Sequence, residues 1–328
     1  MTTDLAVVTG GAGHVGTNLV EALTAAGHQV RVVDLREPVT ACGFGAQWVQ
    51  ADVRNAAALR RAFTGAAVVY HLASLISTVG GLGGRVESIN VGGAHTVATA
   101  ALAARVGRLV HCSSIHAFHL RRPAVDETAP RSDGPRAAPY DRSKALGEAK
   151  VRAAVSDGLD AVIVNPTGII GPRDEAPSRM GTVLRQFWRG RLPATSSGGF
   201  DWVDVRDVAA ALQAAASRGR TGESYLVGGH RCTSRQLLEM AAAVSGRAQR
   251  VRAIPLWSLR MVSPLTTVVA RRNGNPLIPT TEALAALAAF PRISHAKAAK
   301  ELGYMPRPLE QTLRDLYTYY REAGVVPG

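Results

Sequence analysis

A tyrosine and a lysine four residues apart have the chemistry that is easiest to define in this sequence. Tyr140 and Lys144 occur in the run Tyr-Asp-Arg-Ser-Lys, and side chains four residues apart lie on the same face of a helix. An ammonium group beside a phenol stabilises the phenolate and lowers the pKa of the phenol. A tyrosine of this kind can donate or accept a proton when a hydroxyl or keto group reacts. The spacing alone is common on solvated helix faces, so the hypothesis depends on other elements of the chain.

A glycine-rich stretch near the amino terminus predicts a dinucleotide site. Residues 5–9 have the pattern of a short buried parallel strand, a glycine-rich run follows, and a helix is expected from Asn18. In such a motif the first glycines permit a tight turn, the third lets the backbone approach a pyrophosphate, and the last lets the helix pack closely on the strand. The N–H groups of the helix N-terminus carry a partial positive charge that suits phosphates. The cofactor-binding residues expected here are Gly10, Gly13, His14, Val15 and Gly16.

The second expected strand, residues 29–34, ends in an acid that bears on the choice of cofactor. Asp34 lies about 20 residues past the glycines, where a carboxylate accepts hydrogen bonds from the hydroxyls of the adenosine ribose. The same carboxylate repels a 2′-phosphate, which favours NAD over NADP. Arg36 could instead reach and neutralise such a phosphate. The sequence therefore predicts NAD as the cofactor and leaves NADP open through Arg36.

Two serines follow a further expected strand, residues 108–112. In parallel sheets the reactive groups lie at the carboxyl ends of the strands, which is where Ser113 and Ser114 occur. The order of Ser114 before Tyr140 favours Ser114 as a third catalytic residue. Ser113 is the alternative, and a serine that only forms a turn is the other interpretation.

The chain resembles the extended short-chain dehydrogenase/reductase family over essentially its whole length. The matching motifs are residues 9–16, 52–54, 71–74, 90–93, 113–114, 140–144 and 165–172. Their order and spacing together are highly specific. The resemblance implies a Rossmann fold, an NAD(P)-dependent reaction, and a homodimer formed through helices beside the Tyr140 segment.

The resemblance also implies roles for individual residues. Tyr140 would be the acid/base, Ser114 would hydrogen-bond the reacting oxygen, and Lys144 would bind the nicotinamide ribose. Asn90 would tie a helix to a neighbouring strand. The other cofactor contacts implied are Asp52 and Val53 at the adenine, Leu72, Ala73 and Ser74 at the phosphates and ribose, and Pro166 and Ile169 at the nicotinamide.

Two histidines stand where the family has other residues. Members that dehydrate nucleotide sugars follow the catalytic serine or threonine with Asp-Glu, but Ile115 and His116 occur here. The acid that would help to expel water is therefore missing. His116 or His119 could act as a second acid/base, although a lone histidine on a loop is usually solvated.

Phe200 is a second departure from the family pattern. Nucleotide-sugar epimerases commonly carry an arginine there, which grips the diphosphate, and a phenyl ring cannot replace a bidentate phosphate clamp. Either the substrate carries no nucleotide diphosphate or another arginine binds it. This stretch and residues 165–170 are more similar to the dihydroflavonol-reductase and 3β-hydroxysteroid-dehydrogenase branch, which handles apolar ketones and alcohols.

The composition excludes several other classes of protein. The chain has 328 residues and a net charge of +13, which comes almost entirely from arginines spread along it, so we expect no nucleic-acid groove. Three widely spaced cysteines indicate a reducing compartment and no metal site. We expect no signal peptide and no membrane span, since no apolar run reaches ~20 residues. The expected location is the cytoplasm.

The order of strand and helix patterns predicts an α/β fold with a doubly wound parallel sheet. Residues 1–170 and about 201–230 would form the Rossmann domain, and about 171–200 and 231–328 a smaller, mostly helical substrate lobe. The apolar segment 254–269 could be a packed lobe helix, a lid over a hydrophobic substrate, or a patch that touches a membrane.

These observations favour one function over two others. The favoured hypothesis is an NAD(P)-dependent oxidoreductase that interconverts a hydroxyl and a keto group on a small, apolar metabolite. A sugar or nucleotide-sugar epimerase would use the same three residues without net change of the cofactor. A non-catalytic dinucleotide sensor would have no need of them.

Overall fold

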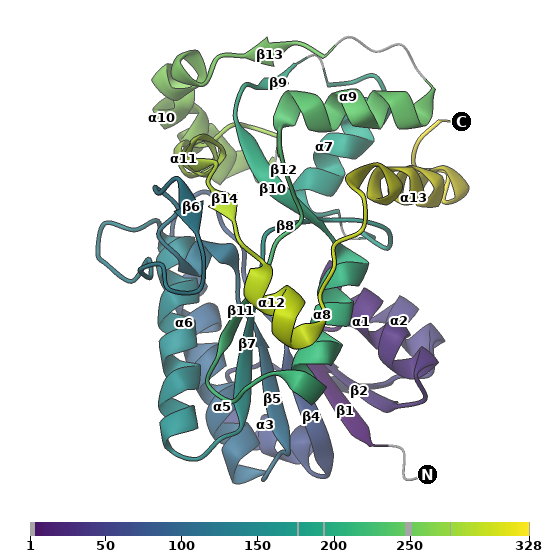
Figure 1. The fold of residues 1–328 in the computed structure, drawn as a ribbon, viewed down its shortest axis with the longest axis vertical. Helices are drawn as coiled ribbons and strands as arrows, with labels where there is room; N and C mark the ends of the chain where they lie inside the picture. Colours follow the sequence, from purple (N-terminus) through teal and green to yellow (C-terminus); the bar gives the residue numbers. More distant parts are fainter. Residues whose placement is uncertain (1–3, 176, 193, 247–250, 276, 328) are drawn as a thin grey trace.

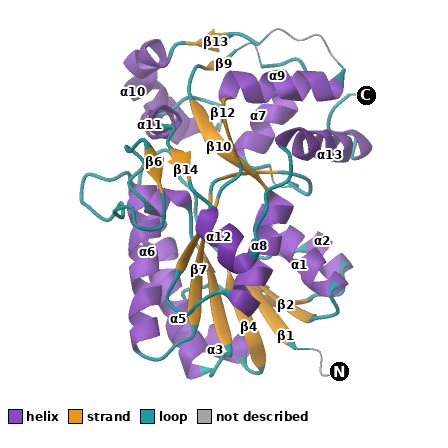
Figure 2. Cartoon of the chain, viewed as in Figure 1, coloured by secondary structure: helices purple, strands orange, loops and turns teal. Residues whose placement is uncertain are grey.

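The computed structural model describes residues 4–175, 177–192, 194–246, 251–275 and 277–327. Figure 1 shows them as two stacked parts, a large sheet with its helices in the lower half and a smaller, mostly helical part in the upper half. Strand β1 (Leu5–Thr9) starts beside the N-terminal end at the bottom and runs towards the upper part (Figure 2). The carboxyl ends of the strands parallel to it therefore face the upper part.

Seven parallel strands form the main sheet, in the order β11-β7-β5-β4-β1-β2-β3. The strands after β1 are β2 (Gln29–Asp34), β3 (Gln47–Gln50), β4 (Ala66–His71), β5 (Arg108–Cys112), β7 (Ala161–Pro166) and β11 (Ser224–Val227). The strand order reverses between β1 and β4, and open parallel sheets bind their ligands in the crevice at such a reversal. The predicted doubly wound sheet is confirmed.

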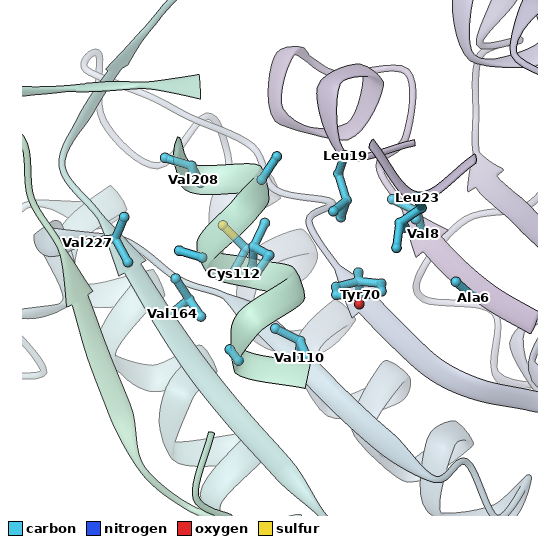
Figure 3. Close-up of a cluster of buried hydrophobic side chains, with 14 of the residues drawn as sticks. Ala6, Val8, Leu19, Leu23, Tyr70, Val110, Cys112, Val164, Val208 and Val227 are labelled. Atoms are coloured by element: carbon cyan, nitrogen blue, oxygen red, sulfur yellow. The ribbon is translucent and has the colours of Figure 1, made fainter. Parts of the chain in front are cut away.

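Helices cover both faces of this sheet because alternate strand residues point to opposite sides. Val8 packs in one buried cluster with side chains of α1 (His14–Ala25) and α8 (Val205–Arg218), and Val7 packs in a second cluster. Figure 3 shows the first cluster, in which Leu19 and Leu23 lie on Val8. The second cluster packs α3 (Ala56–Phe63), α5 (Gly93–Ala103) and α6 (Pro139–Ser156) on the other face.

Helix α1 begins at His14, so the expected start at Asn18 is wrong. Gly13 occupies the position before the first helical residue, and its carbonyl already accepts a hydrogen bond from the N–H of Thr17 at 2.9 Å. The last residues of the glycine motif thus form the first turn of the helix, because a tight turn at Gly10 leads directly into it.

The upper part has a three-stranded sheet of its own. It consists of β8 (Gly168–Ile170), β10 (Gly199–Asp204) and β12 (His230–Thr233), and β10 leads directly into α8 on the main sheet. Its helices are α7 (Arg179–Trp188), α9 (Ser234–Ser245), α10 (Leu256–Asn273), α11 (Thr281–Ala289) and α13 (Leu309–Glu322). Helix α12 (Ala296–Leu302) packs instead on α8 and β11 of the main sheet, where Ala298 and Leu302 join the buried cluster. Within the described ranges, no helix is both long enough and apolar enough to cross a bilayer.

A short strand pair connects the two parts beside the site. Strand β14 (Arg292–Ile293) pairs with β6 (Ala124–Val125), which lies in the loop that precedes α6. This pairing holds Ile293 against the loop that leads into α6.

Candidate active site

The three predicted catalytic residues meet at the carboxyl end of β5. Ser114 follows this strand, and Tyr140 and Lys144 lie in the first turns of α6. A hydrogen bond joins the side chains of Ser114 and Tyr140. The Lys144 Nζ donates to the carbonyl oxygen of Cys112 at 3.2 Å and to Ser74 Oγ at 3.4 Å.

The expectation that Lys144 lowers the pKa of Tyr140 is not met in this structure. Desolvation by the surrounding atoms raises the pKa of Tyr140, and the hydrogen bond with Ser114 offsets only part of that effect. Burial also lowers the pKa of Lys144, whose ammonium is directed at Cys112 and Ser74. The phenol therefore keeps its proton at neutral pH.

The two serines after β5 have different surroundings. Ser114 Oγ accepts a hydrogen bond from the N–H of His116 at 3.2 Å besides its bond with Tyr140. Ser113 Oγ is buried and has no hydrogen-bond partner among the described residues. The geometry favours Ser114 as the serine that acts with Tyr140.

His116 lies within the site, and His119 does not. The His116 Nδ1 is 2.8 Å from Asp141 Oδ1, and its ring stacks on Phe200 at 5.7 Å between centroids. The His116 ring also meets the ring of Tyr140 in an edge-on arrangement, with 5.5 Å between centroids. The side chain of His119 is exposed.

The glycine turn has the shape that a dinucleotide requires. Gly10 has a positive φ of 74°, and a Cβ on it would lie 2.6 Å from the N of Ala73. A Cβ on Gly16 would lie 2.4 Å from the carbonyl oxygen of Gly10, so only glycine lets α1 pack this closely. A Cβ on Gly13 would meet only that same oxygen, at 3.3 Å, so Gly13 is open on its other side. Since α1 also has no side-chain cap, its first N–H groups are suited to a pyrophosphate.

Asp34, the last residue of β2, is fixed beside this turn. Asp34 Oδ2 accepts a hydrogen bond from the N–H of Ala12 at 3.1 Å, and Oδ1 accepts one from the N–H of Arg36 at 3.1 Å. The side chain of Arg36 is exposed. The carboxylate and the glycine turn could therefore hold the two ends of an adenosine diphosphate.

His14 has a second task that the sequence did not indicate. Its Nε2 lies 3.1 Å from the carbonyl oxygen of Gly171 and 3.0 Å from that of Pro172. Asn18 Nδ2 also donates to Pro172, at 3.2 Å. The imidazole thus ties α1 to the segment after β8, and only the backbone of His14 could contact a phosphate.

The remaining predicted cofactor residues lie at the same edge of the main sheet, except Ile169, which lies in the sheet of the upper part. Asp52 binds Arg54 through both carboxylate oxygens, and this bond lowers the pKa of Asp52. Leu72 and Ala73 follow β4, where Leu72 donates its N–H to the carbonyl of Thr9 at 3.1 Å. Val53 is buried, Pro166 ends β7, and Ile169 lies in β8.

Asn90 makes the structural ties that were expected of it. Its Oδ1 accepts from the N–H of Leu75 at 2.7 Å and from Ser74 Oγ at 3.2 Å, and its Nδ2 donates to Ser143 Oγ at 2.9 Å. It lies in one turn of π-helix, Ser88–Gly92. The loop after β4 is thereby held against α6.

Sequence reasoning missed a buried network behind Ser114. Asn165 Nδ2 donates to the carbonyl oxygen of Ser114 at 3.0 Å and to Glu148 Oε1 at 2.5 Å. Glu148 is buried and forms an ion pair with Arg131 at 3.0 Å. Glu148 lies four residues after Lys144, so extending the helical spacing from Tyr140 would have found it.

The surroundings of Phe200 are mostly apolar. A small cavity there is lined by Ile115, Leu120, Thr167, Phe200, Asp201, Pro291 and Ile293. Within the part of the chain that the structure describes, no three His, Cys, Asp or Glu side chains are grouped so as to bind a metal ion.

Known proteins are similar to this chain over nearly its whole length. The model of the NAD dependent epimerase/dehydratase family matches residues 6–228. Sterol demethylase protein B of Methylococcus capsulatus is 33% identical over 98% of this chain and 99% of its own. A putative dihydroflavonol 4-reductase of Synechocystis is 29% identical over 98% of this chain and 96% of its own. The crystal structure of gox2253 has a TM-score of 0.84 and 30% identity, covering 98% of this chain and 99% of that one.

Proposed function

Since the chain belongs to the NAD-dependent epimerase/dehydratase family, we propose that it interconverts a hydroxyl and a keto group on a small, apolar metabolite by hydride transfer with NAD. The observation that carries this proposal is the grouping of Ser114, Tyr140 and Lys144 at the strand ends beside the glycine turn. Such a reaction needs two components at one edge of the sheet. One is a group that can donate a proton, and the other is a turn that binds the dinucleotide.

Each of the three residues would have one task. The nicotinamide, when bound, supplies or accepts the hydride. Tyr140 gives its proton to the oxygen of the keto group in the direction of reduction, and takes a proton from the hydroxyl in the direction of oxidation. Ser114 hydrogen-bonds the same oxygen and sets its distance from Tyr140, and Lys144 holds the hydroxyls of the nicotinamide ribose.

The choice of NAD rests on Asp34. Both oxygens of its carboxylate accept backbone hydrogen bonds, which hold the negative charge beside the glycine turn, where it repels a 2′-phosphate. Arg36 is exposed and keeps NADP as the second candidate. Dissociation constants for NADH and NADPH decide between them, because NADPH binding about tenfold tighter, or 1.4 kcal/mol, would contradict the choice of NAD.

The apolar class of substrate rests on Phe200 and its neighbours. A phenyl ring that stacks on His116 and borders a mostly apolar cavity cannot grip a diphosphate. The relatives similar to this chain include proteins named for a sterol and for a dihydroflavonol.

The second candidate is a sugar epimerase, because the family itself includes epimerases. It would use the same three residues to oxidise and then re-reduce one carbon. A non-catalytic sensor would need neither the Ser114–Tyr140 hydrogen bond nor the lysine beside it.

The test of the proposed function gives the protein NADH with a panel of apolar ketones, and separately NAD with nucleotide sugars. Absorbance follows the nicotinamide, and NMR follows the substrates. We expect loss of NADH equal to the amount of ketone reduced. Inversion of a sugar centre without net change of the cofactor would instead establish the epimerase.

We also propose that the chain works as a homodimer through α5 and α6 in the cytoplasm. These two helices pack on each other beside the Tyr140 segment. The described cysteines Cys42, Cys112 and Cys232 are all free, which suits a reducing compartment. Sedimentation at a mass near twice 34.5 kDa tests the dimer.

A further inference from the structure

Helix α10 turns its apolar side chains outward. Trp257 is 68% exposed, and Met261 and Leu265 are each 75% exposed. These three positions lie four residues apart and therefore on one face. We call this exposed set the α10 face, and it consists of Trp257, Met261, Val262, Leu265, Val268 and Val269. Of the three alternatives for segment 254–269, a fully packed lobe helix does not describe α10, since a helix of that kind buries its apolar face.

The inner side of α10 is held by hydroxyl groups. Ser263 Oγ lies 3.1 Å from Thr281 Oγ1, and Thr266 Oγ1 donates to the carbonyl oxygen of Pro279 at 2.6 Å. The N–H of Thr281 donates to Thr267 Oγ1 at 3.0 Å. The polar side of the helix is thus attached to the start of α11, and the apolar side is exposed on the surface.

The charged residues of α10 and the segments that flank it have one sign. Residues 251–275 contain no aspartate or glutamate, and they include the exposed arginines Arg252, Arg260, Arg271 and Arg272. A second copy of the chain would bring the same arginines towards each other. An anionic lipid surface would attract them, and it would accept the indole of Trp257 at the boundary of headgroups and acyl chains.

The position of α10 agrees with a surface role. It lies at the outer edge of the upper part in Figure 1, where it packs on α11. Arg271 Nε donates to the carbonyl oxygen of Val79 at 2.8 Å, in the loop that follows β4. Ile76 in that loop is 72% exposed. The end of α10 is therefore tied to the loop that also carries Ser74 of the site.

We propose that α10 binds in the plane of an anionic lipid membrane, with the α10 face at the boundary between headgroups and acyl chains. The helix lies on the membrane and does not cross it, in keeping with the absence of a spanning helix in the described ranges. The proposal does not depend on the catalytic chemistry, and its test does not measure activity.

The experiment is co-sedimentation of the full chain with vesicles of phosphatidylcholine alone and of phosphatidylcholine mixed with phosphatidylglycerol. We expect binding to the mixed vesicles that weakens with added salt. The double variant Met261→Ser/Leu265→Ser should reduce the partition coefficient at least about tenfold, because two large apolar side chains are lost from the buried area. Arg260→Gln should reduce the preference for the anionic vesicles about fivefold.

Met305→Ser is the matched control. Met305 is 84% exposed but lies between α12 and α13, outside the α10 face, so its variant should bind vesicles like the unaltered chain. Circular dichroism and thermal unfolding check that each variant is folded.

Three outcomes would overturn the proposal. The first is that the unaltered chain does not sediment with the mixed vesicles. The second is that the double variant and the Met305→Ser control bind equally well. The third is that the double variant splits a stable oligomer without changing vesicle binding, which would show that the α10 face covers a second copy of the chain.

Discussion

Tyr140 is the residue through which pH should act on the proposed reaction. Desolvation raises its pKa more than the hydrogen bond with Ser114 lowers it, so the phenol holds its proton at neutral pH. Reduction of a ketone needs that protonated form, because Tyr140 must donate a proton. Oxidation of an alcohol needs the phenolate, because Tyr140 must accept one.

The two directions should therefore respond to pH differently. We predict that kcat/KM for alcohol oxidation rises as the pH is raised above neutrality, because the phenolate fraction grows. For ketone reduction it should stay level from neutral pH through the alkaline range, because the raised pKa of Tyr140 keeps the phenol protonated there. Initial rates across pH test this in both directions. Oxidation that is fastest in acid would contradict it.

His116 and His119 give a second, paired prediction. The ring of His116 stacks on Phe200 and lies beside Tyr140, with Asp141 on its Nδ1, whereas His119 is exposed. His116→Ala should lower kcat/KM about a hundredfold, the lower end of what a positioned acid or base contributes to proton transfer.

His119→Ala serves as the control and should leave kcat/KM unchanged. Steady-state rates of both variants with the same ketone measure the difference. Equal rates in the two variants would mean that the position of His116 beside Tyr140 has no consequence for the reaction.

The residue types of the site could be predicted, but some of their partners could not. Ser114, Tyr140 and Lys144 stand at spacings that local rules interpret, at a strand end and on one helix face. Asp141 meets His116 across 25 residues, which no spacing rule covers. The direction of the Lys144 ammonium depends on the Cys112 carbonyl at the end of another element. Such contacts arise only from the tertiary fold.

At the scale of elements, the glycine turn decides how close α1 comes to β1. The two glycines Gly13 and Gly16 have different surroundings, since a Cβ on Gly16 would overlap the backbone and a Cβ on Gly13 would not. Gly16 is therefore required by the fold itself. Gly13 is required only by a ligand that approaches the backbone.

Alanine variants separate these two requirements. Gly16→Ala should lower the melting temperature and lose about 1–3 kcal/mol of stability, because the backbone must move. Gly13→Ala should keep the melting temperature but weaken NADH binding about tenfold, or 1.4 kcal/mol. Calorimetry of unfolding and of NADH binding measures both quantities.

Gly134→Ala is the control, because a Cβ there would meet nothing within 4 Å, and we expect it to change neither quantity. The interpretation of the turn would be contradicted if Gly13→Ala bound NADH as tightly as the unaltered chain.

Element boundaries could be predicted where local chemistry sets them. Helix α9 starts after Thr233, whose side chain forms a capping box with Gln236, and it ends at Gly246 with a positive φ of 66°. Helix α1 was expected too late because its first turn consists of the glycine motif itself. For α10 the sequence predicted the helix but not whether its apolar side is buried or exposed. The hydroxyl contacts that orient the helix involve residues 279–281, which lie outside it.

The whole molecule brings distant parts of the chain to one sheet edge. The glycine turn, Ser114 and the α6 residues belong to the sheet part, whereas Phe200 and Ile293 come from the upper part. The pairing of β14 with β6 holds the two together beside the start of α6. In the proposed reaction, cofactor and substrate would meet between these two parts of one chain, and the central claim concerns the hydride transfer between them.

The most direct test of that claim follows a deuterium atom. The protein is given an apolar ketone and NADH that carries deuterium at the hydride-donating position, and NMR locates the label. We predict one deuterium on the new carbinol carbon for each NADH oxidised. Tyr140→Phe should still bind NADH yet transfer almost none. A product without the label, or sugar inversion without net loss of NADH, would contradict the account.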